Sequence, residues 1–147
     1  MKFLVINGPN LNILGKRDHT FYGNMTLKQI NILLQKKAKE LGVTLAFFQS
    51  NHEGDIIDFL QKESANAKGV LINPGALTHY GYSLRDALID TKLPIVSVHL
   101  SDIDNREEFR KVDVLSDIVV DNIKGLQEKS YILGLERLVS HIRNNPK

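Results

Sequence analysis

The start of the chain indicates the fold, because residues 2–41 are KFLVINGPNLNILGKRDHTFYGNMTLKQINILLQKKAKEL. The apolar run at residues 2–6 predicts a buried strand. Thr26 and Gln29 have the spacing of a capping box at the start of a helix. Apolar residues then recur at helical spacing, at Leu27, Ile30, Leu34, Ala38 and Leu41. A buried strand followed by an amphipathic helix predicts a βα unit, the building block of α/β proteins.

The same order of elements recurs along the rest of the chain. Strands are expected at residues 43–49, 69–73, 94–100 and 117–123, and helices at 53–67, 82–90, 106–111 and 127–142. A second capping box, formed by Ser50 and Glu53, is expected to open the helix at residue 53. Short strands that are apolar on both faces are typical of a parallel sheet buried between helices. The sequence therefore predicts an α/β fold, a flavodoxin-like, doubly wound, five-stranded parallel sheet of order 2-1-3-4-5 with helices on both faces.

Composition excludes several classes of protein. The 147 residues are 42% hydrophobic and 24% charged, which predicts one globular domain over residues 1–147. Nineteen basic and 17 acidic residues give a net charge of +2, too balanced for a nucleic-acid-binding surface. The lack of cysteine excludes disulfides, thiolate catalysis and cysteine zinc sites. No apolar run is long enough for a signal sequence or a membrane span, so we expect a cytoplasmic protein without a membrane partner.

The loop after the first strand is far longer than the roughly 2–6 residues usual in α/β units. Ligands of doubly wound sheets bind beyond the carboxyl ends of the strands, where such loops lie. Polar stretches follow the first, third and fourth predicted strands, at residues 7–23, 73–79 and 98–102. Arg106 and Arg110 follow closely enough to join them. Side chains expected to converge at this edge are Arg17, Tyr22, Asn73, His79, His99 and Ser101.

Phosphate and metal motifs do not match these loops. A Walker A loop requires a glycine where Asn10 stands and Ser or Thr where Arg17 follows Gly15-Lys16. The dinucleotide motif G-x-G-x-x-G and the zinc motif H-E-x-x-H are both absent from the sequence. A flavin carrier remains an alternative that the fold allows, although its first loop would be expected to be rich in Ser and Thr. We therefore expect neither a metal nor another cofactor.

The side chains that remain are suited to acid–base chemistry. A guanidinium such as that of Arg17 favours the ionised form of a nearby phenol, and Tyr22 follows five residues later. A tyrosinate is a general base, and a histidine across the cleft would be the matching acid. Arg110 is suited to clamp a substrate carboxylate. This combination fits removal of a proton next to a carbonyl and expulsion of a β-hydroxyl group.

Six ordered stretches together resemble the type II 3-dehydroquinases, over nearly the whole chain. They are NGPNLNILGKR…YG, FFQSNHEGDIID, INPGALTH, LRDAL, VHLS and REEFR. The resemblance implies a flavodoxin-like fold and a dodecamer built as four trimers. It also implies the activity of a hydro-lyase that needs no cofactor. Such an enzyme eliminates water from 3-dehydroquinate in anti fashion through an enolate, in the shikimate pathway to aromatic amino acids or in quinate breakdown.

The resemblance also implies roles for single residues. Tyr22 resembles the base that removes the C2 proton, and His99 resembles the acid that protonates the leaving hydroxyl. Arg17 resembles the residue that favours the tyrosinate and stabilises the transition state. Asn10 resembles the group that holds a water at the enolate oxygen, and Asp86 a contact from a neighbouring subunit. The expected substrate contacts within the chain are Asn73, His79, Leu100, Ser101 and Arg110. The long first loop would be a lid that closes over the substrate.

The sequence departs from the resembled family near the expected acid. Ser97 stands where the family commonly has Glu, two residues before His99. Residues 102–105 and 112–114 also differ from the usual pattern. We hypothesise that Asp102 or Asp104 replaces the missing carboxylate, because both are close to His99 in sequence. The departures leave a second function open, that of a non-catalytic small-molecule-binding module on the same fold.

Overall fold

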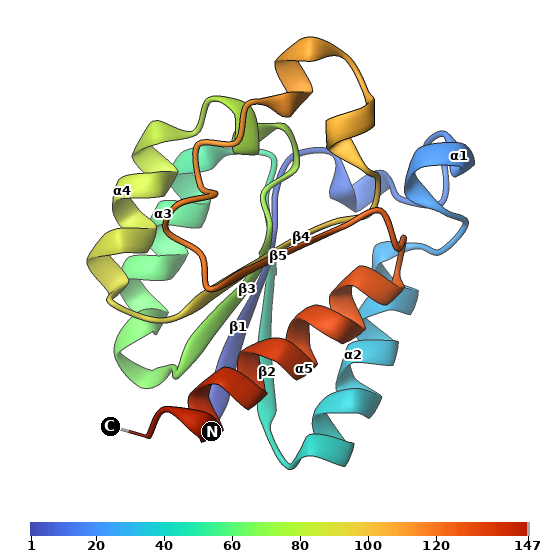
Figure 1. Ribbon diagram of the computed structural model, residues 1–147. Coiled ribbons are helices and arrows are strands. Elements are labelled where there is room, and N and C mark those ends of the chain that lie inside the picture. The colour runs from blue at the N-terminus through green and yellow to red at the C-terminus, as the bar shows by residue number, and fades with distance from the viewer. Residues whose placement is uncertain (147) are drawn as a thin grey trace.

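Five parallel strands form one sheet in the computed structural model, which describes residues 1–146 (Figure 1). The strand order is β2-β1-β3-β4-β5, so the predicted doubly wound arrangement is confirmed. β1 pairs with β2 and β3, and β4 pairs with β3 and β5. The strands are β1 (Lys2–Asn7), β2 (Thr44–Gln49), β3 (Gly69–Asn73), β4 (Ile95–His99) and β5 (Asp121–Lys124).

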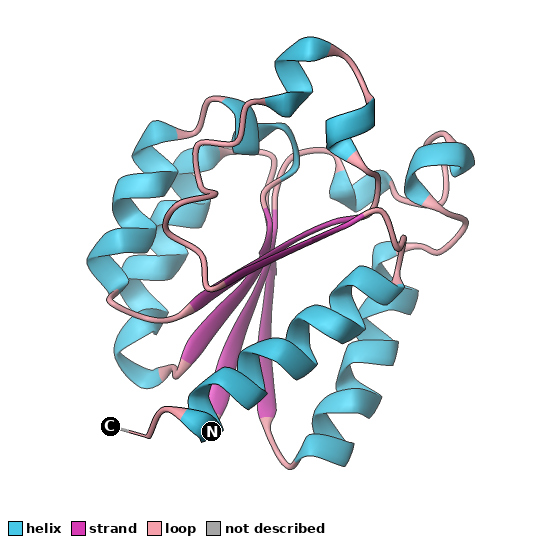
Figure 2. Ribbon diagram, in the orientation of Figure 1, coloured by secondary structure: helices cyan, strands magenta, loops and turns pink. Residues whose placement is uncertain are grey.

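Helices cover both faces of this sheet (Figure 2). α2 (Leu27–Leu41) and α5 (Lys129–Asn144) lie on one face, and α3 (Glu53–Glu63) and α4 (Tyr82–Thr91) on the other (Figure 1). Each face has its own apolar core, because successive side chains of a strand point to opposite sides. On β4, Val96 and Val98 join the core beneath α2 and α5. Ser97 and His99 therefore face the side of α3 and α4.

Hydrogen bonds at the start of α2 confirm the first predicted capping box. The Thr26 hydroxyl accepts from the Gln29 backbone N–H at 3.2 Å, and the Gln29 side chain accepts from the Thr26 N–H at 2.9 Å. The second predicted box is wrong, because Ser50 lies outside the helix and donates to Asp55 at 2.7 Å. Glu53 instead accepts from the Leu84 backbone N–H at 3.0 Å, which ties α3 to α4.

The fifth strand begins later than the apolar pattern predicts, at Asp121 instead of residue 117. The segment before it turns at Asp113, whose carboxylate accepts from the Leu115 backbone N–H at 2.9 Å. Leu115 is fully buried in the core beside α3 and α4. An ion pair between Arg85 of α4 and Asp117 also holds this segment. Its apolar residues therefore pack a loop onto the core and do not extend the strand.

Short helical turns shape the loops at the carboxyl edge of the sheet. The long loop after β1 contains η1 (Leu11–Ile13) and the single turn α1 (His19–Tyr22). The loop after β3 forms η3 (Gly75–His79), and the chain after β4 forms η4 (Ile103–Asn105) and η5 (Glu108–Lys111). A further turn, η2 (Ser64–Asn66), replaces the expected last turn of α3. Within residues 1–146, no helix is both long enough and apolar enough to cross a bilayer.

Candidate active site

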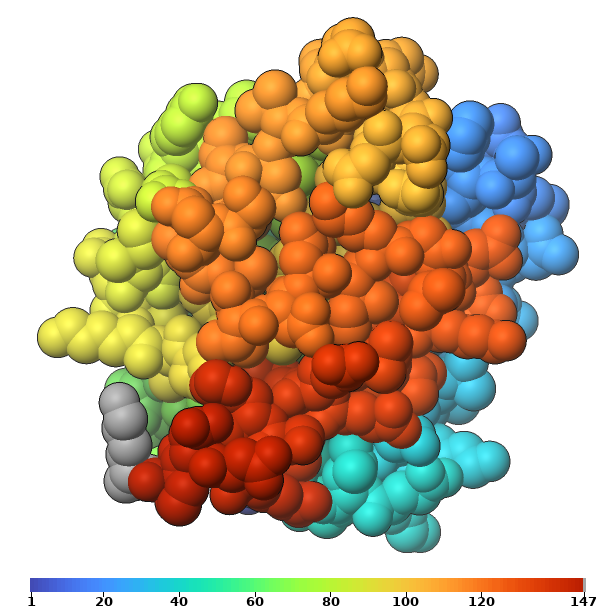
Figure 3. Space-filling model, in the orientation of Figure 1, coloured from blue at the N-terminus to red at the C-terminus, as the bar shows by residue number. Residues whose placement is uncertain are grey.

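The loops after β1, β3 and β4 enclose a cavity at the carboxyl edge of the sheet. These strands are neighbours in the sheet, so the loops that follow them meet (Figure 1). In the space-filling view, the segment after β4 lies against the first loop (Figure 3). The cavity has a volume of about 130 Å³. Its lining includes every predicted site residue except Asp86, namely Asn10, Arg17, Tyr22, Asn73, His79, His99, Leu100, Ser101 and Arg110.

Tyr22 lies between two guanidinium groups. The Arg17 guanidinium stacks on the Tyr22 ring, 3.7 Å from the ring centroid. Arg106 donates a hydrogen bond of 2.9 Å to the Tyr22 hydroxyl and also lies 4.1 Å from the centroid of Phe21. Two positive charges therefore lie against the ring and the hydroxyl of Tyr22. The sequence placed Arg106 near the site but gave no sign of this contact.

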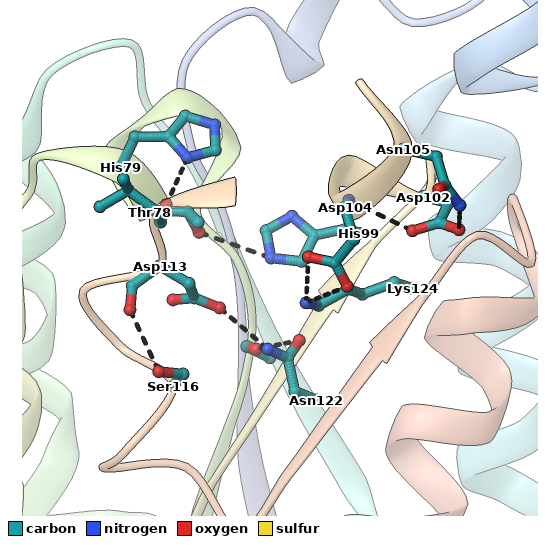
Figure 4. A network of polar contacts seen from close by, with 12 residues as sticks. Thr78, His79, His99, Asp102, Asp104, Asn105, Asp113, Ser116, Asn122 and Lys124 are labelled. Carbon is teal, nitrogen blue, oxygen red and sulfur yellow. Dashed lines mark hydrogen bonds and ion pairs between the residues drawn. The ribbon is translucent and has the colours of Figure 1, made fainter. Parts of the chain in front are cut away.

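His99 ends β4 and is almost completely buried. Its Nε2 atom lies 3.5 Å from the hydroxyl of Thr78 in η3 (Figure 4). Burial lowers the pKa of His99 to about 4, and the Asp113 carboxylate is the main group that opposes this effect. The imidazole of the ligand-free protein is therefore neutral at pH 7. A neutral imidazole must take up a proton before it acts as a general acid, and a nearby negative charge favours this protonation.

Neither Asp102 nor Asp104 hydrogen-bonds the imidazole of His99. The Asp102 carboxylate accepts from the Asp104 backbone N–H and from the Asn105 side chain. Asp104 instead pairs with Lys124, with 3.0 Å between its carboxylate and the ammonium group (Figure 4). The expectation that one of these carboxylates holds the imidazole is therefore wrong.

A buried hydrogen-bond network fixes the floor of the cavity. Asn73 donates to the Tyr131 hydroxyl at 2.9 Å, and this hydroxyl donates to Asn7 at 2.6 Å. Tyr131 comes from α5 and is fully buried, and this burial raises the pKa of its phenol. The side-chain carbonyl oxygen of Asn73 also accepts a hydrogen bond from the Gly75 backbone N–H. The Asn73 amide is thus held in place before any ligand binds.

The loops after β1 and β3 approach each other too closely for a side chain at residue 8. A Cβ atom on Gly8 would lie 2.3 Å from the carbonyl oxygen of Pro74. The next turn places Asn10 in the left-handed region, with a φ of 70°, and the Asn10 N–H donates to the Asn51 side chain at 2.9 Å. Across the cavity, the Nδ1 atom of His79 lies 2.7 Å from the Val112 carbonyl oxygen. These contacts join the start of the first loop to the loop after β2, and η3 to the segment after η5.

A family model described as dehydroquinase class II matches residues 1–139. The chain belongs to the class II dehydroquinase family. A 3-dehydroquinate dehydratase of Roseiflexus castenholzii is 53% identical over 139 residues, which are 95% of this chain and 88% of the relative. One from Prochlorococcus marinus subsp. pastoris is 48% identical and covers 99% of both chains.

Crystal structures of class II dehydroquinases agree with this assignment. The type II dehydroquinase from Butyrivibrio crossotus superimposes with a TM-score of 0.91 at 41% identity, covering 94% of this chain and 97% of its own. The family resemblance and the fold inferred from sequence are thus confirmed. None of these comparisons supports the alternative of a non-catalytic binding module.

Asp86 differs in position from the other predicted residues of this dehydroquinase family member. It is exposed on α4 and does not line the cavity of its own chain.

Among residues 1–146, no three His, Asp or Glu side chains come together as a metal site. Thr78 beside His99 is not among the predicted site residues, although it directly precedes the predicted His79. Asp113 is not among them either, because it is joined to the strand of His99 only through Asn122 on β5 and Ser97 on β4.

Proposed function

We propose that the chain is a type II 3-dehydroquinate dehydratase, a hydro-lyase that converts 3-dehydroquinate to 3-dehydroshikimate by anti elimination of water. One observation carries the proposal: Tyr22, held between the guanidinium groups of Arg17 and Arg106, lines the same cavity as the buried His99. A base and an acid on one small cavity suit an elimination. Family membership and the names of the relatives support this substrate.

The first step is removal of a proton from C2, next to the substrate carbonyl. The Tyr22 phenolate accepts this proton, and the electron pair of the broken C–H bond moves to the carbonyl oxygen to form an enolate. The guanidinium groups of Arg17 and Arg106 lie next to the ring and the hydroxyl of Tyr22 in this step. Asn10 lines the cavity and is assigned the water at the enolate oxygen.

The second step expels the β-hydroxyl group. His99 donates a proton to this hydroxyl, the C–O bond breaks, and the electrons of the enolate form the new carbon–carbon double bond. Water leaves, and no electron donor or acceptor is needed. That the reaction needs no cofactor stays a prediction from the sequence. Arg110 is proposed to bind the substrate carboxylate. The remaining substrate contacts are proposed to come from Asn73, His79, Leu100 and Ser101.

The long first loop is proposed to act as a lid within a single catalytic domain. Arg17 and Tyr22 both lie on it, in or beside the single turn α1. A loop that carries catalytic groups excludes water and completes the site in the same movement. This role explains a connection that is far longer than a βα unit requires. Participation in the shikimate pathway and a cytoplasmic location stay predictions that rest on the sequence and the resemblance.

The assembly is proposed to be a dodecamer of four trimers, in which Asp86 reaches the site of a neighbouring subunit. Large apolar side chains exposed on α4 and on the neighbouring segments support an interface there, because burying them against a partner is favourable. They are Tyr80, Tyr82, Ile89, Phe109 and Val112. Asp86 is exposed on the same helix and does not line the active-site cavity of its own chain.

An absorbance assay tests the activity. Chelator-treated protein is mixed with 3-dehydroquinate, and ultraviolet absorbance follows the conjugated double bond of the product. We expect a rise in absorbance that Tyr22→Phe abolishes, while binding of the substrate to this variant is largely retained. Ile32→Ala, which alters an exposed side chain of α2 outside the cavity and away from α4, is the control and keeps full turnover. Turnover that survives in Tyr22→Phe would show that the assigned base is wrong.

A further inference from the structure

Asn122 and Asp113 lie below His99 in Figure 4, and they belong to a series of three hydrogen-bonded side chains that begins at Ser97. The Ser97 hydroxyl donates to the Asn122 carbonyl oxygen at 2.8 Å, and the Asn122 amide donates to the Asp113 carboxylate at 2.9 Å. Ser97 and Asn122 are register partners on β4 and β5. Because side chains alternate along a strand, Ser97 and His99 point to the same face of the sheet. These hydrogen bonds therefore join the strand of His99 to a carboxylate in the loop after η5.

Both carboxylate oxygens of Asp113 are held by fixed donors. One accepts from Asn122, and the other accepts from the backbone N–H of Leu115, which is fully buried. The Ser116 hydroxyl donates to the Asp113 carbonyl oxygen at 3.1 Å, which closes the turn. Among residues 1–146, no cation lies within ion-pair distance of Asp113. Its negative charge is thus fixed in place and is not neutralised by an ion pair.

The other charged groups around His99 do not supply comparable support. Lys124, its register partner on β5, disfavours the imidazolium, as does His79 of η3. Asp104 of η4 favours the imidazolium, but its carboxylate is already paired with the Lys124 ammonium group. Asp113 is the strongest charged group acting in favour of the protonated form. Other titratable groups lining the same cavity are Arg17, Tyr22, Arg106 and Arg110.

We propose that Asp113 is a positioning residue for the acid of the reaction: held by Asn122 and Ser97, its carboxylate stabilises the imidazolium of His99 that protonates the leaving hydroxyl. Asp113 touches neither substrate nor His99 directly and acts through a fixed charge and the strand that carries the acid. The inference rests on the proposed dehydration, because only that reaction assigns His99 as an acid. The charge coupling itself is a property of the protein without substrate.

The kinetic test is the pH dependence of kcat in Asp113→Asn, which removes the charge and keeps the size of the side chain. We expect the limb on which kcat falls at high pH to move about one pH unit lower. At pH values above this limb, kcat would then fall about tenfold, because the protonated fraction of His99 falls tenfold. KM would change less than about threefold, because no substrate contact is altered.

Asp117→Asn is the matched control. It removes a carboxylate from the same loop, together with the ion pair to Arg85, but Asp117 is exposed and is not among the charged groups that act on His99. We expect its pH profile to match the wild type. A loss of kcat in Asp113→Asn that is the same at every pH would overturn the proposal, because it would show a structural defect only.

A second measurement does not depend on turnover. The carbon-13 chemical shift of the His99 ring reports its titration directly in histidine-labelled protein. We expect His99 to titrate at lower pH in Asp113→Asn than in the wild type and Asp117→Asn. Asn122→Ser breaks the hydrogen bonds between Ser97 and Asp113 and keeps the Asp113 charge, so it should give a smaller shift of the His99 titration in the same direction. It replaces Asp113→Asn as the test if that variant does not fold. Unchanged His99 titration in the folded variant would overturn the proposal, whereas an inactive wild type would contradict only the proposed dehydration.

Discussion

The protonation of His99 depends on its burial and on the charged groups around it. Burial at the end of β4 makes the ring neutral at pH 7, so its protonation depends on nearby negative charge. Two residues earlier, Ser97 provides no charge of its own and instead bonds to Asn122. The carboxylate that acts on His99 comes from Asp113, in a loop that the sequence pattern assigned no role. In the arrangement proposed above, Asp113 therefore supplies the carboxylate that is missing at position 97.

Burial of His99 predicts a pH-dependent stability. The folded pKa of about 4 lies below the unfolded value of about 6.5. Between these values the unfolded chain binds a proton that the folded chain does not, so stability falls as pH decreases through this range. We expect the wild type to lose about 2 kcal/mol more than His99→Gln between pH 7 and pH 4.5. Urea unfolding at equal protein concentrations measures this, and equal losses would contradict it.

At the scale of elements, the order of the strands builds the site. β1, β3 and β4 are the three adjacent central strands, so polar residues at their carboxyl ends meet without any special sequence between them. Alternation along β4 then divides its side chains between an apolar core and the site. The long first loop joins α2 at Thr26, where the capping box begins the helix.

The capping box of α2 predicts a measurable loss of stability. Thr26→Ala leaves the backbone N–H of Gln29 without its side-chain acceptor, and such caps typically contribute about 1 kcal/mol. We expect the free energy of unfolding to fall by about this amount in urea titrations. Lys28→Ala, an exposed position in the same first turn, is the control and should change stability by less than about 0.5 kcal/mol. Equal effects in both variants would show that the box adds nothing.

At the scale of the whole molecule, the apolar side chains exposed around α4 are the feature that a single chain leaves unexplained. Asp86 on this helix has no part in the cavity of its own chain. A site that takes Asp86 from a neighbour would be incomplete in an isolated subunit. Packing of α4 against a second copy would also cover the exposed rings of Tyr80 and Tyr82.

Mixed oligomers test this arrangement. Tyr22→Phe and Asp86→Ala should each be nearly inactive when pure, since one lacks the base and the other the contact from its neighbour. If the two variants assemble together at random in equal amounts, roughly one site in four combines an intact Tyr22 with an intact Asp86 from the next subunit. We expect about a quarter of the wild-type activity after joint refolding. No recovery in mixed oligomers would contradict a shared site.

The sequence by itself determined the order and type of most elements, the capping box of α2, and the edge of the sheet where the site lies. Periodicity, caps and strand ends are local properties, and the topology of parallel sheets brings the ends of β1, β3 and β4 together. Only the tertiary structure decided the start of β5 and the polar partners within the site. Arg106 bonds Tyr22 across 84 residues of sequence, and Tyr131 bonds Asn7 across 124. Such pairs follow from how distant elements pack, since most buried polar atoms bond to a partner that packing brings within reach.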